Sequence, residues 1–293
     1  MPRDLTDRVI VITGASSGIG AATALACAKE GMDLVLNARR PDRLQAVADE
    51  IRCIGRRAEL VLGDVTRPGM SAQLLDAAER HFGHFNAVFA NAGYGIRRAV
   101  AELDERDLRE IFEVNFFAAN DLLREAARRL IGAHRPGHLL MCSSSVARFT
   151  LPEYGAYCAT KAAQAHVCRA MRMELKPFHI EVSSVHPITT TTEFVEVARR
   201  RSGLPPREPD IIHQVPKPFI QSPRRVARAV VSCLRRPRAE VWTSLTVRCL
   251  CGAVTAFPWL QDLLFARRIA NRPPGSSPPP GSTDQLLTRN TRD

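Results

Sequence analysis

Tyr157 and Lys161 are four residues apart in YGAYCATKAA, a stretch whose apolar spacing predicts a buried helix. Residues four apart share one helix face, so the phenol and the amine should lie one turn from each other. An ammonium beside a phenol favours the phenolate, so we expect the pKa of Tyr157 to fall from its usual value of about 10. The pair predicts a tyrosine that exchanges protons near neutral pH, although a structural tyrosine beside a solvent-facing lysine would give the same pattern.

The segments that must position this pair alternate between strand and helix patterns. Strands are predicted at residues 8–13, 33–38, 58–62, 86–90, 138–143 and 180–186, with a further strand at 239–244. Such nearly continuous apolar strands are typical of sheets that are covered on both faces. Strands separated by amphipathic helices indicate a parallel sheet. The predicted fold class is therefore α/β, a single doubly wound domain with a parallel sheet.

Composition divides the chain into three parts. Residues 1–243 carry the alternating pattern, and prolines within them make about 190–223 a long, irregular, functional loop. Residues 244–270 are predicted to form a C-terminal helical segment. Residues 271–293 include NRPPGSSPPPGSTDQ, which has too little hydrophobic content to offset the entropy of ordering, so we predict a disordered tail.

The composition also argues against several classes of function. The net charge is +11, but the arginines are spread along the chain without interleaved aromatic residues, so no nucleic-acid partner is expected. The eight cysteines show no framework spacing and no signal peptide is apparent, which favours free thiols in a reducing cytoplasm. No metal site is expected, because Pro136 and Gly137 break any helix between His134 and His138.

A glycine-rich turn, TGASSGIG, follows the first strand and opens the first helix. Gly14, Gly18 and Gly20 permit a tight turn and a close approach of the backbone to phosphate, and the N-terminus of the helix favours an anion. The same glycine spacing also occurs in plain turns. Its position between a strand and a helix predicts a dinucleotide site.

The end of the second strand distinguishes NAD from NADP. NAD sites hold a carboxylate there, whereas the 2′-phosphate of NADP requires cations. Here the strand ends in LNARRPDR, with Arg39 and Arg40 in tandem and no acid before Asp42. Guanidinium groups bind phosphate through paired, charge-assisted hydrogen bonds. NADP(H) is therefore the preferred cofactor and NAD(H) the alternative, while a solvated charge at a strand end would look the same.

Six ordered motifs resemble the short-chain dehydrogenase/reductase family over about residues 7–243: TGASSGIG, GDVT, NAG, EVN, SSS and YCATK. The resemblance implies a Rossmann fold, a homodimer or homotetramer, and hydride transfer between NADP(H) and a carbonyl or secondary alcohol. It implies that Tyr157 is the general acid/base, that Lys161 lowers its pKa and binds the nicotinamide ribose, and that Asn115 holds a water in the proton relay. The cofactor-binding residues that it implies are Gly14, Ser16, Ser17, Gly18, Ile19, Gly20, Arg39, Arg40, Asp64, Val65, Asn91, Ala92, Gly93, Tyr157, Lys161, Pro187, Ile188, Thr190 and Thr192.

The resemblance leaves two positions open. The serine that orients the substrate oxygen lies within SSS, where counting back from YGAY selects Ser144, with Ser145 as the alternate. After Pro187 the family has a glycine, but this chain has Ile188, whose branched side chain would shift or tighten the pocket at the nicotinamide carboxamide. Thr190 and Thr192 in the same loop still match hydroxyl positions that meet the cofactor.

The loop after Thr192 is rich in apolar residues, and we expect an apolar small-molecule substrate, although a lid packed on the core would have the same composition. These apolar residues are Phe194, Val195, Leu204, Ile211, Ile212, Val215 and Phe219. The whole-chain alternatives are a lipid or steroid ketoreductase at a membrane surface and a non-catalytic, nucleotide-sensing relative.

Residues 241–272 combine leucine and aromatic residues with arginines. The uncharged run from Cys249 to Gln261 is shorter than the roughly 20 residues of a spanning helix. The segment predicts a C-terminal helix that covers the substrate pocket or a dimer surface. The alternative is an interfacial helix that makes peripheral contact with an anionic membrane surface.

Overall fold

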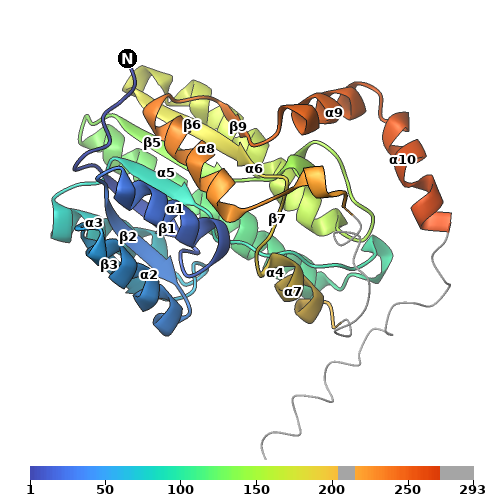
Figure 1. The fold of residues 1–293 in the computed structure, drawn as a ribbon, viewed down its shortest axis with the longest axis horizontal. Helices are drawn as coiled ribbons and strands as arrows, with labels where there is room; N and C mark the ends of the chain where they lie inside the picture. Colours follow the sequence, from blue (N-terminus) through green and yellow to red (C-terminus); the bar gives the residue numbers. More distant parts are fainter. Residues whose placement is uncertain (204–214, 271–293) are drawn as a thin grey trace, which may run out of the picture.

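The computed structural model describes residues 1–203 and 215–270 (Figure 1). In this part of the chain, seven parallel strands form the main sheet in the order β3-β2-β1-β4-β5-β6-β9. The strands are β1 (Val9–Thr13), β2 (Asp33–Ala38), β3 (Ala58–Leu62), β4 (Ala87–Ala90), β5 (Gly137–Cys142), β6 (Ile180–His186) and β9 (Glu240–Trp242). Two short strands, β7 (Thr189–Thr190) and β8 (Ile220–Gln221), pair in parallel beside this sheet.

Helices cover both faces of the sheet, because successive strand residues point to opposite faces and nearly all of them are apolar. One face packs against α1 (Gly18–Lys29), α2 (Pro41–Cys53) and α8 (Pro223–Arg235). The other face packs against α3 (Met70–Phe82), α5 (Ala118–Gly132) and α6 (Gly155–Glu174). Along β1, for example, Ile10 and Ile12 belong to the first core, whereas Val9 and Val11 belong to the second.

The remaining elements lie around the sheet and at its end. They are η1 (Val100–Glu102), α4 (Glu105–Phe112), the π-helical turn η2 (Glu113–Phe117), η3 (Ser145–Ala147), η4 (Lys176–Phe178), α7 (Phe194–Arg201), η6 (Lys217–Phe219), α9 (Leu245–Ala256) and α10 (Trp259–Ala270). In Figure 1, α9 and α10 extend to one side of the sheet, with α10 farthest from the strands. The described residues include no helix that is both long and apolar enough to cross a bilayer.

The predicted doubly wound α/β fold is confirmed, and so is a helical segment after the sheet. The segment 190–223 is less irregular than expected, because it contains α7, β7 and β8. Phe194, Val197, Ala198 and Arg201 follow the period of an amphipathic helix, a signal that the prolines downstream obscured. The apolar loop positions 204, 211 and 212 and the predicted disordered tail lie outside the described residues.

Candidate active site

The order of the strands reverses between β1 and β4, and a crevice forms at their carboxyl ends where the connections diverge. Thr13 at the end of β1 and Asn91 after β4 meet there. The Thr13 hydroxyl accepts the backbone N–H of Asn91 at 3.0 Å, and the Asn91 amide donates to the Thr13 carbonyl at 3.0 Å. These bonds tie the glycine-rich turn to the NAG segment across the crevice.

Two glycines of the turn leave no room for a side chain. Gly14 has a φ of 65°, and a Cβ there would lie 2.9 Å from the Cα of Ala92. A Cβ on Gly20 would collide with the carbonyl oxygen of Gly14. The turn therefore packs its own backbone against the neighbouring strand end, which leaves its outer edge and the start of α1 accessible to a phosphate.

The arginines that follow β2 reach acidic and hydroxyl partners at the same end of the crevice. Arg39 binds the Asp64 carboxylate at 3.3 Å, and Arg40 donates to the Ser17 hydroxyl at 2.7 Å and to Glu193 at 2.8 Å. Burial alone would raise the pKa of Asp64. Hydrogen bonds from Thr66 and the charge of Arg39 outweigh burial and lower that pKa.

Helix α6 carries Tyr157 and Lys161 on one face, with the lysine Nζ 5.6 Å from the centre of the tyrosine ring. Lys161 is 4% exposed, and its Nζ donates to the Cys142 carbonyl at 2.7 Å and to the Gln164 amide oxygen at 3.1 Å. Burial lowers the pKa of Lys161 to about 8, because desolvation disfavours the ammonium. The two side chains share one helix face, as the spacing predicted, and both line the cavity.

The predicted fall in the pKa of Tyr157 was wrong for this geometry. Burial is the largest effect and raises the pKa of Tyr157 well above its usual value, while the side-chain hydrogen bond with Ser144 opposes this effect only in part. The ammonium of Lys161 is directed to the Cys142 carbonyl and not to the phenol oxygen. Sequence spacing placed the two groups on one face but did not reveal the neighbours that compete for the charge.

Asn115 occupies the π-helical turn η2 and is completely buried. Its amide oxygen accepts the backbone N–H of Tyr94 at 2.9 Å, and its amide nitrogen donates to the Tyr94 carbonyl at 2.9 Å and to the Thr160 hydroxyl at 3.2 Å. The carbonyl oxygen of Asn115 accepts a hydrogen bond from the amide of Gln164. The Gln164 side chain thus bridges Asn115 and Lys161, the two residues that the implied relay would connect.

Ser144 and Ser145 face different partners. The Ser144 side chain is hydrogen-bonded to Tyr157, whereas the backbone N–H of Ser145 donates to the Pro187 carbonyl at 2.9 Å. The carbonyl of Ser144 is 3.0 Å from Nδ1 of His186, whose ring stacks on Trp242 with centroids 4.5 Å apart. The structure therefore brings the Ser144 side chain to the phenol of Tyr157.

Ile188 lines the cavity and also packs against α9. It is 7% exposed and packs with Val247 and Cys251 of α9, together with Phe149 and Trp242. The carbonyl of Ile188 accepts the Thr190 hydroxyl at 2.7 Å. The branched side chain in the usual glycine position thus fixes α9 to the loop that borders the crevice.

All predicted site residues except Gly20 and Asn115 line one cavity of about 750 Å³, a volume typical of ligand sites. Part of its lining is apolar and includes Phe149, Leu151, Phe194, Val197, Phe219 and Leu250. Arg200 and Arg201 also line it, and Arg201 binds Glu110 at 3.3 Å and stacks 4.0 Å over the ring of Tyr94. The cavity extends from the arginines after β2 to the catalytic candidates on α6.

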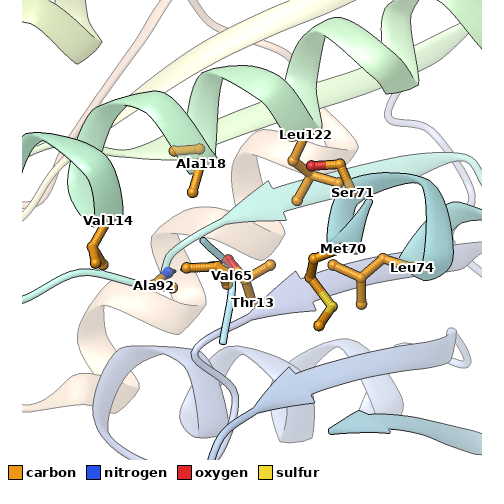
Figure 2. Close-up of a pocket in the computed structure, with 10 residues that line it drawn as sticks. Thr13, Val65, Met70, Ser71, Leu74, Ala92, Val114, Ala118 and Leu122 are labelled. Atoms are coloured by element: carbon orange, nitrogen blue, oxygen red, sulfur yellow. Dashed lines mark hydrogen bonds between the residues drawn. The ribbon is translucent and has the colours of Figure 1, made fainter. Parts of the chain in front are cut away.

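Figure 2 shows a second, much smaller cavity of about 10 Å³ between α3, α5 and the strand ends. Thr13, Met70 and Leu122 are among the residues that line it. A cavity of roughly this size holds one water molecule at most. It is a gap in the packing beside the larger cavity and not a ligand site.

Gln164, His186 and Glu193 are among the residues at the site that were not predicted from the sequence. Gln164 lies three residues after Lys161 and so shares its helix face, which is a usable signal. His186 directly precedes Pro187, but nothing in the sequence places it beneath Ser144. Glu193 follows the threonine loop, and its contact with Arg40 joins positions 153 residues apart.

The two helices after the sheet differ in what they contact. In α9, Val247 and Leu250 line the cavity, so this helix covers one side of the crevice. In α10, the side chains of Trp259 and Leu263 are 60% and 68% exposed, and Gln261 accepts the backbone N–H of Thr150 at 3.1 Å.

The chain belongs to the short-chain dehydrogenase family, because residues 8–202 match the model described as short chain dehydrogenase. An uncharacterized oxidoreductase of Mycobacterium tuberculosis is 34% identical over 200 residues, which are 68% of this chain and 76% of that protein. The family and this cavity define an oxidoreductase with a nucleotide-binding Rossmann fold.

Two solved structures show the same fold. A short-chain dehydrogenase/reductase from Burkholderia phymatum in complex with NAD has a TM-score of 0.78 at 24% identity, over 88% of this chain and 96% of that one. An alcohol dehydrogenase from Thermococcus sibiricus complexed with 5-hydroxy-NADP has a TM-score of 0.67 at 29% identity, over 80% of this chain and 95% of that one. Proteins similar to this chain thus bind either type of nicotinamide cofactor.

Proposed function

We propose that the chain is an NADP(H)-preferring dehydrogenase/reductase that acts on the carbonyl or secondary alcohol of an apolar substrate. The observation that carries the proposal is the single cavity that joins Arg39 and Arg40 to Ser144 and Tyr157. Cations at one end suit a 2′-phosphate, and a proton donor with a hydroxyl partner at the other end suits a carbonyl oxygen.

The cofactor would lie along residues whose packing fits a dinucleotide. The backbone of the glycine turn and the start of α1 would hold the pyrophosphate, while Asp64 and Val65 would border the adenine. Asn91, Ala92 and Gly93 line the same cavity and would border the cofactor on the side of β4. The bound nicotinamide would supply or accept the hydride.

The chain's own residues then handle the oxygen of the substrate. In the direction of reduction, Tyr157 donates its proton to this oxygen, and the Ser144 hydroxyl hydrogen-bonds the same atom. Proton transfer from a positioned side chain typically contributes about 10²–10⁴-fold to the rate. A tyrosine whose pKa is raised by burial keeps its proton at neutral pH, which suits a general acid. Lys161 places a positive charge beside the ring and within reach of the cavity.

The apolar side chains that line the cavity beside Tyr157 support an apolar substrate. Phe194 lies against Tyr157 with ring centroids 5.1 Å apart, so a substrate that reaches the phenol must contact an aromatic surface. A panel of steroid ketones, 3-keto lipids and retinal-like aldehydes, assayed with NADPH by nicotinamide absorbance, tests this inference. Turnover of small polar ketones alone would contradict it.

Arg39→Ala tests the cofactor preference. Hydrogen bonds to charged groups contribute about 1.5–3 kcal/mol, so the variant should bind NADPH at least roughly tenfold more weakly, with little change for NADH. Arg106→Ala is a matched control, because this exposed arginine on α4 lies outside the cavity. Equal losses for both cofactors would mean that Arg39 is structural and would return the assignment to NAD(H).

A further inference from the structure

Glu193 binds two arginines at the end of the cavity assigned to the cofactor's 2′-phosphate. It follows Thr192 at the end of the threonine loop, just before α7. One carboxylate oxygen accepts a hydrogen bond from Arg40 at 2.8 Å, and the other accepts one from Arg43. Arg40 and Arg43 stand at the start of α2, so the carboxylate joins the substrate loop to the first turn of that helix.

The neighbours of Glu193 on both sides hold it in this position. Thr192 lies against the glycine turn, because a Cβ on Gly18 would be 3.1 Å from the Thr192 methyl group. Phe194 packs against Tyr157 and fills the space beside Gly95, where a Cβ would lie 2.5 Å from its ring. Residue 193 therefore lies between two packed side chains, with its carboxylate directed at the arginines.

The charged side chains at this end of the cavity leave little excess positive charge to bind a phosphate. Three guanidinium groups, from Arg39, Arg40 and Arg43, face two carboxylates, from Asp64 and Glu193. A phosphate monoester carries between about −1.5 and −2 charges at pH 7. Hydrogen bonds from Arg40 and Arg43 lower the pKa of Glu193, so its charge persists at neutral pH. A carboxylate and a phosphate on the same guanidinium groups would repel each other.

We infer that Glu193 is a specificity-determining residue whose carboxylate competes with the 2′-phosphate for Arg40 and Arg43. It thereby weakens the preference for NADP(H) over NAD(H). A cofactor that carries a hydroxyl in place of the phosphate leaves both ion pairs intact, so only NADP(H) has to displace Glu193. This inference rests on the proposed function, because it takes the arginines after β2 as the 2′-phosphate site.

The test measures binding of adenosine 2′,5′-bisphosphate and of 5′-ADP by calorimetry, with no turnover required. Wild type, Glu193→Gln and Glu196→Gln are compared after removal of bound nucleotide. Glu196 is the matched control, because it is an exposed acid on α7 and its change removes the same charge. Glu193→Gln should bind the bisphosphate about fivefold more tightly, which corresponds to about 1 kcal/mol. Its affinity for 5′-ADP and both affinities of Glu196→Gln should stay within about twofold of wild type.

The outcomes separate this inference from the function on which it rests. If wild type prefers the bisphosphate and Glu193→Gln keeps the same ratio of affinities, the inference fails and the NADP(H) preference stands. A loss of that preference in Glu193→Gln would also overturn the inference, because Glu193 would then organise the arginines. If no variant prefers the bisphosphate, the cofactor assignment and the inference fail together. A similar gain in affinity for the bisphosphate in Glu196→Gln, or for 5′-ADP in Glu193→Gln, would assign the effect to net charge. It would overturn the inference that Glu193 competes with the 2′-phosphate.

Discussion

Burial of Lys161 should make the stability of the protein without cofactor rise with pH. Burial lowers the pKa of Lys161 from 10.5 to about 8. Between about pH 8 and 10.5 the unfolded chain binds more protons at this residue than the native chain, so the free energy of unfolding increases with pH. At about 1.4 kcal/mol per pH unit, this difference corresponds to about 3 kcal/mol.

The perturbation that isolates this effect is Lys161→Met. The substitution removes the titrating group and also the hydrogen bonds to Cys142 and Gln164, which adds an offset that does not depend on pH. The free energy of unfolding of wild type minus that of the variant should therefore increase by about 2–3 kcal/mol between pH 7 and pH 10. The other titrating groups are common to both proteins.

Urea unfolding at half-unit pH intervals, followed by circular dichroism, measures this difference. The dependence of the free energy of unfolding on urea concentration, the m value, is held the same for all proteins. Lys176→Met provides the baseline, because it removes an exposed lysine outside the site. A difference for Lys161→Met that parallels this baseline would refute the lowered pKa of the lysine. A difference that decreases with pH would mean that the folded protein stabilises the ammonium.

Three further predictions follow from the site. Tyr157→Phe should abolish turnover and leave cofactor affinity nearly unchanged, because only the transferable proton is lost; a tenth of the wild-type rate would refute the acid role. Ser144→Ala should reduce kcat more than Ser145→Ala, since Ser144 hydrogen-bonds Tyr157, and the reverse order in steady-state assays would select Ser145. A chain that ends at Ala256 lacks α10 and should lose salt-sensitive sedimentation with anionic liposomes. Equal sedimentation of both forms, or none by the full chain, would reject a membrane role for α10.

The sheet could be predicted closely because helices cover both of its faces. Nearly every strand residue is therefore buried, and each strand is a short apolar run in the sequence. The runs at 33–38, 58–62 and 180–186 coincide with β2, β3 and β6. Of the other strands, β5 is offset by one residue from its predicted range, and β1, β4 and β9 are shorter than predicted. The glycine turn and the tyrosine–lysine pair could also be predicted from the sequence, because each depends on the spacing of residues within one short segment.

Contacts between distant segments could not be predicted in the same way. The packing of His186 beneath Ser144 and the ion pair of Glu193 with Arg40 depend on how loops from separate strands meet at one edge of the sheet. The direction predicted for the pKa shift of Tyr157 was wrong for the same reason, because the shift depends on segments that are distant in the sequence. Spacing gives the neighbours on the helix, whereas desolvation depends on everything else that surrounds the phenol.

The carboxamide of Gln164 holds Asn115 and Lys161 together but offers no path for a proton between them. Its nitrogen donates to the Asn115 carbonyl, and its oxygen accepts from the Lys161 ammonium. A carboxamide has fixed donor and acceptor ends and does not exchange its role as a hydroxyl or a water does. This bridge therefore fixes the position of the lysine without conducting a proton to Asn115. A proton path between Asn115 and Lys161 would therefore need a route other than this side chain.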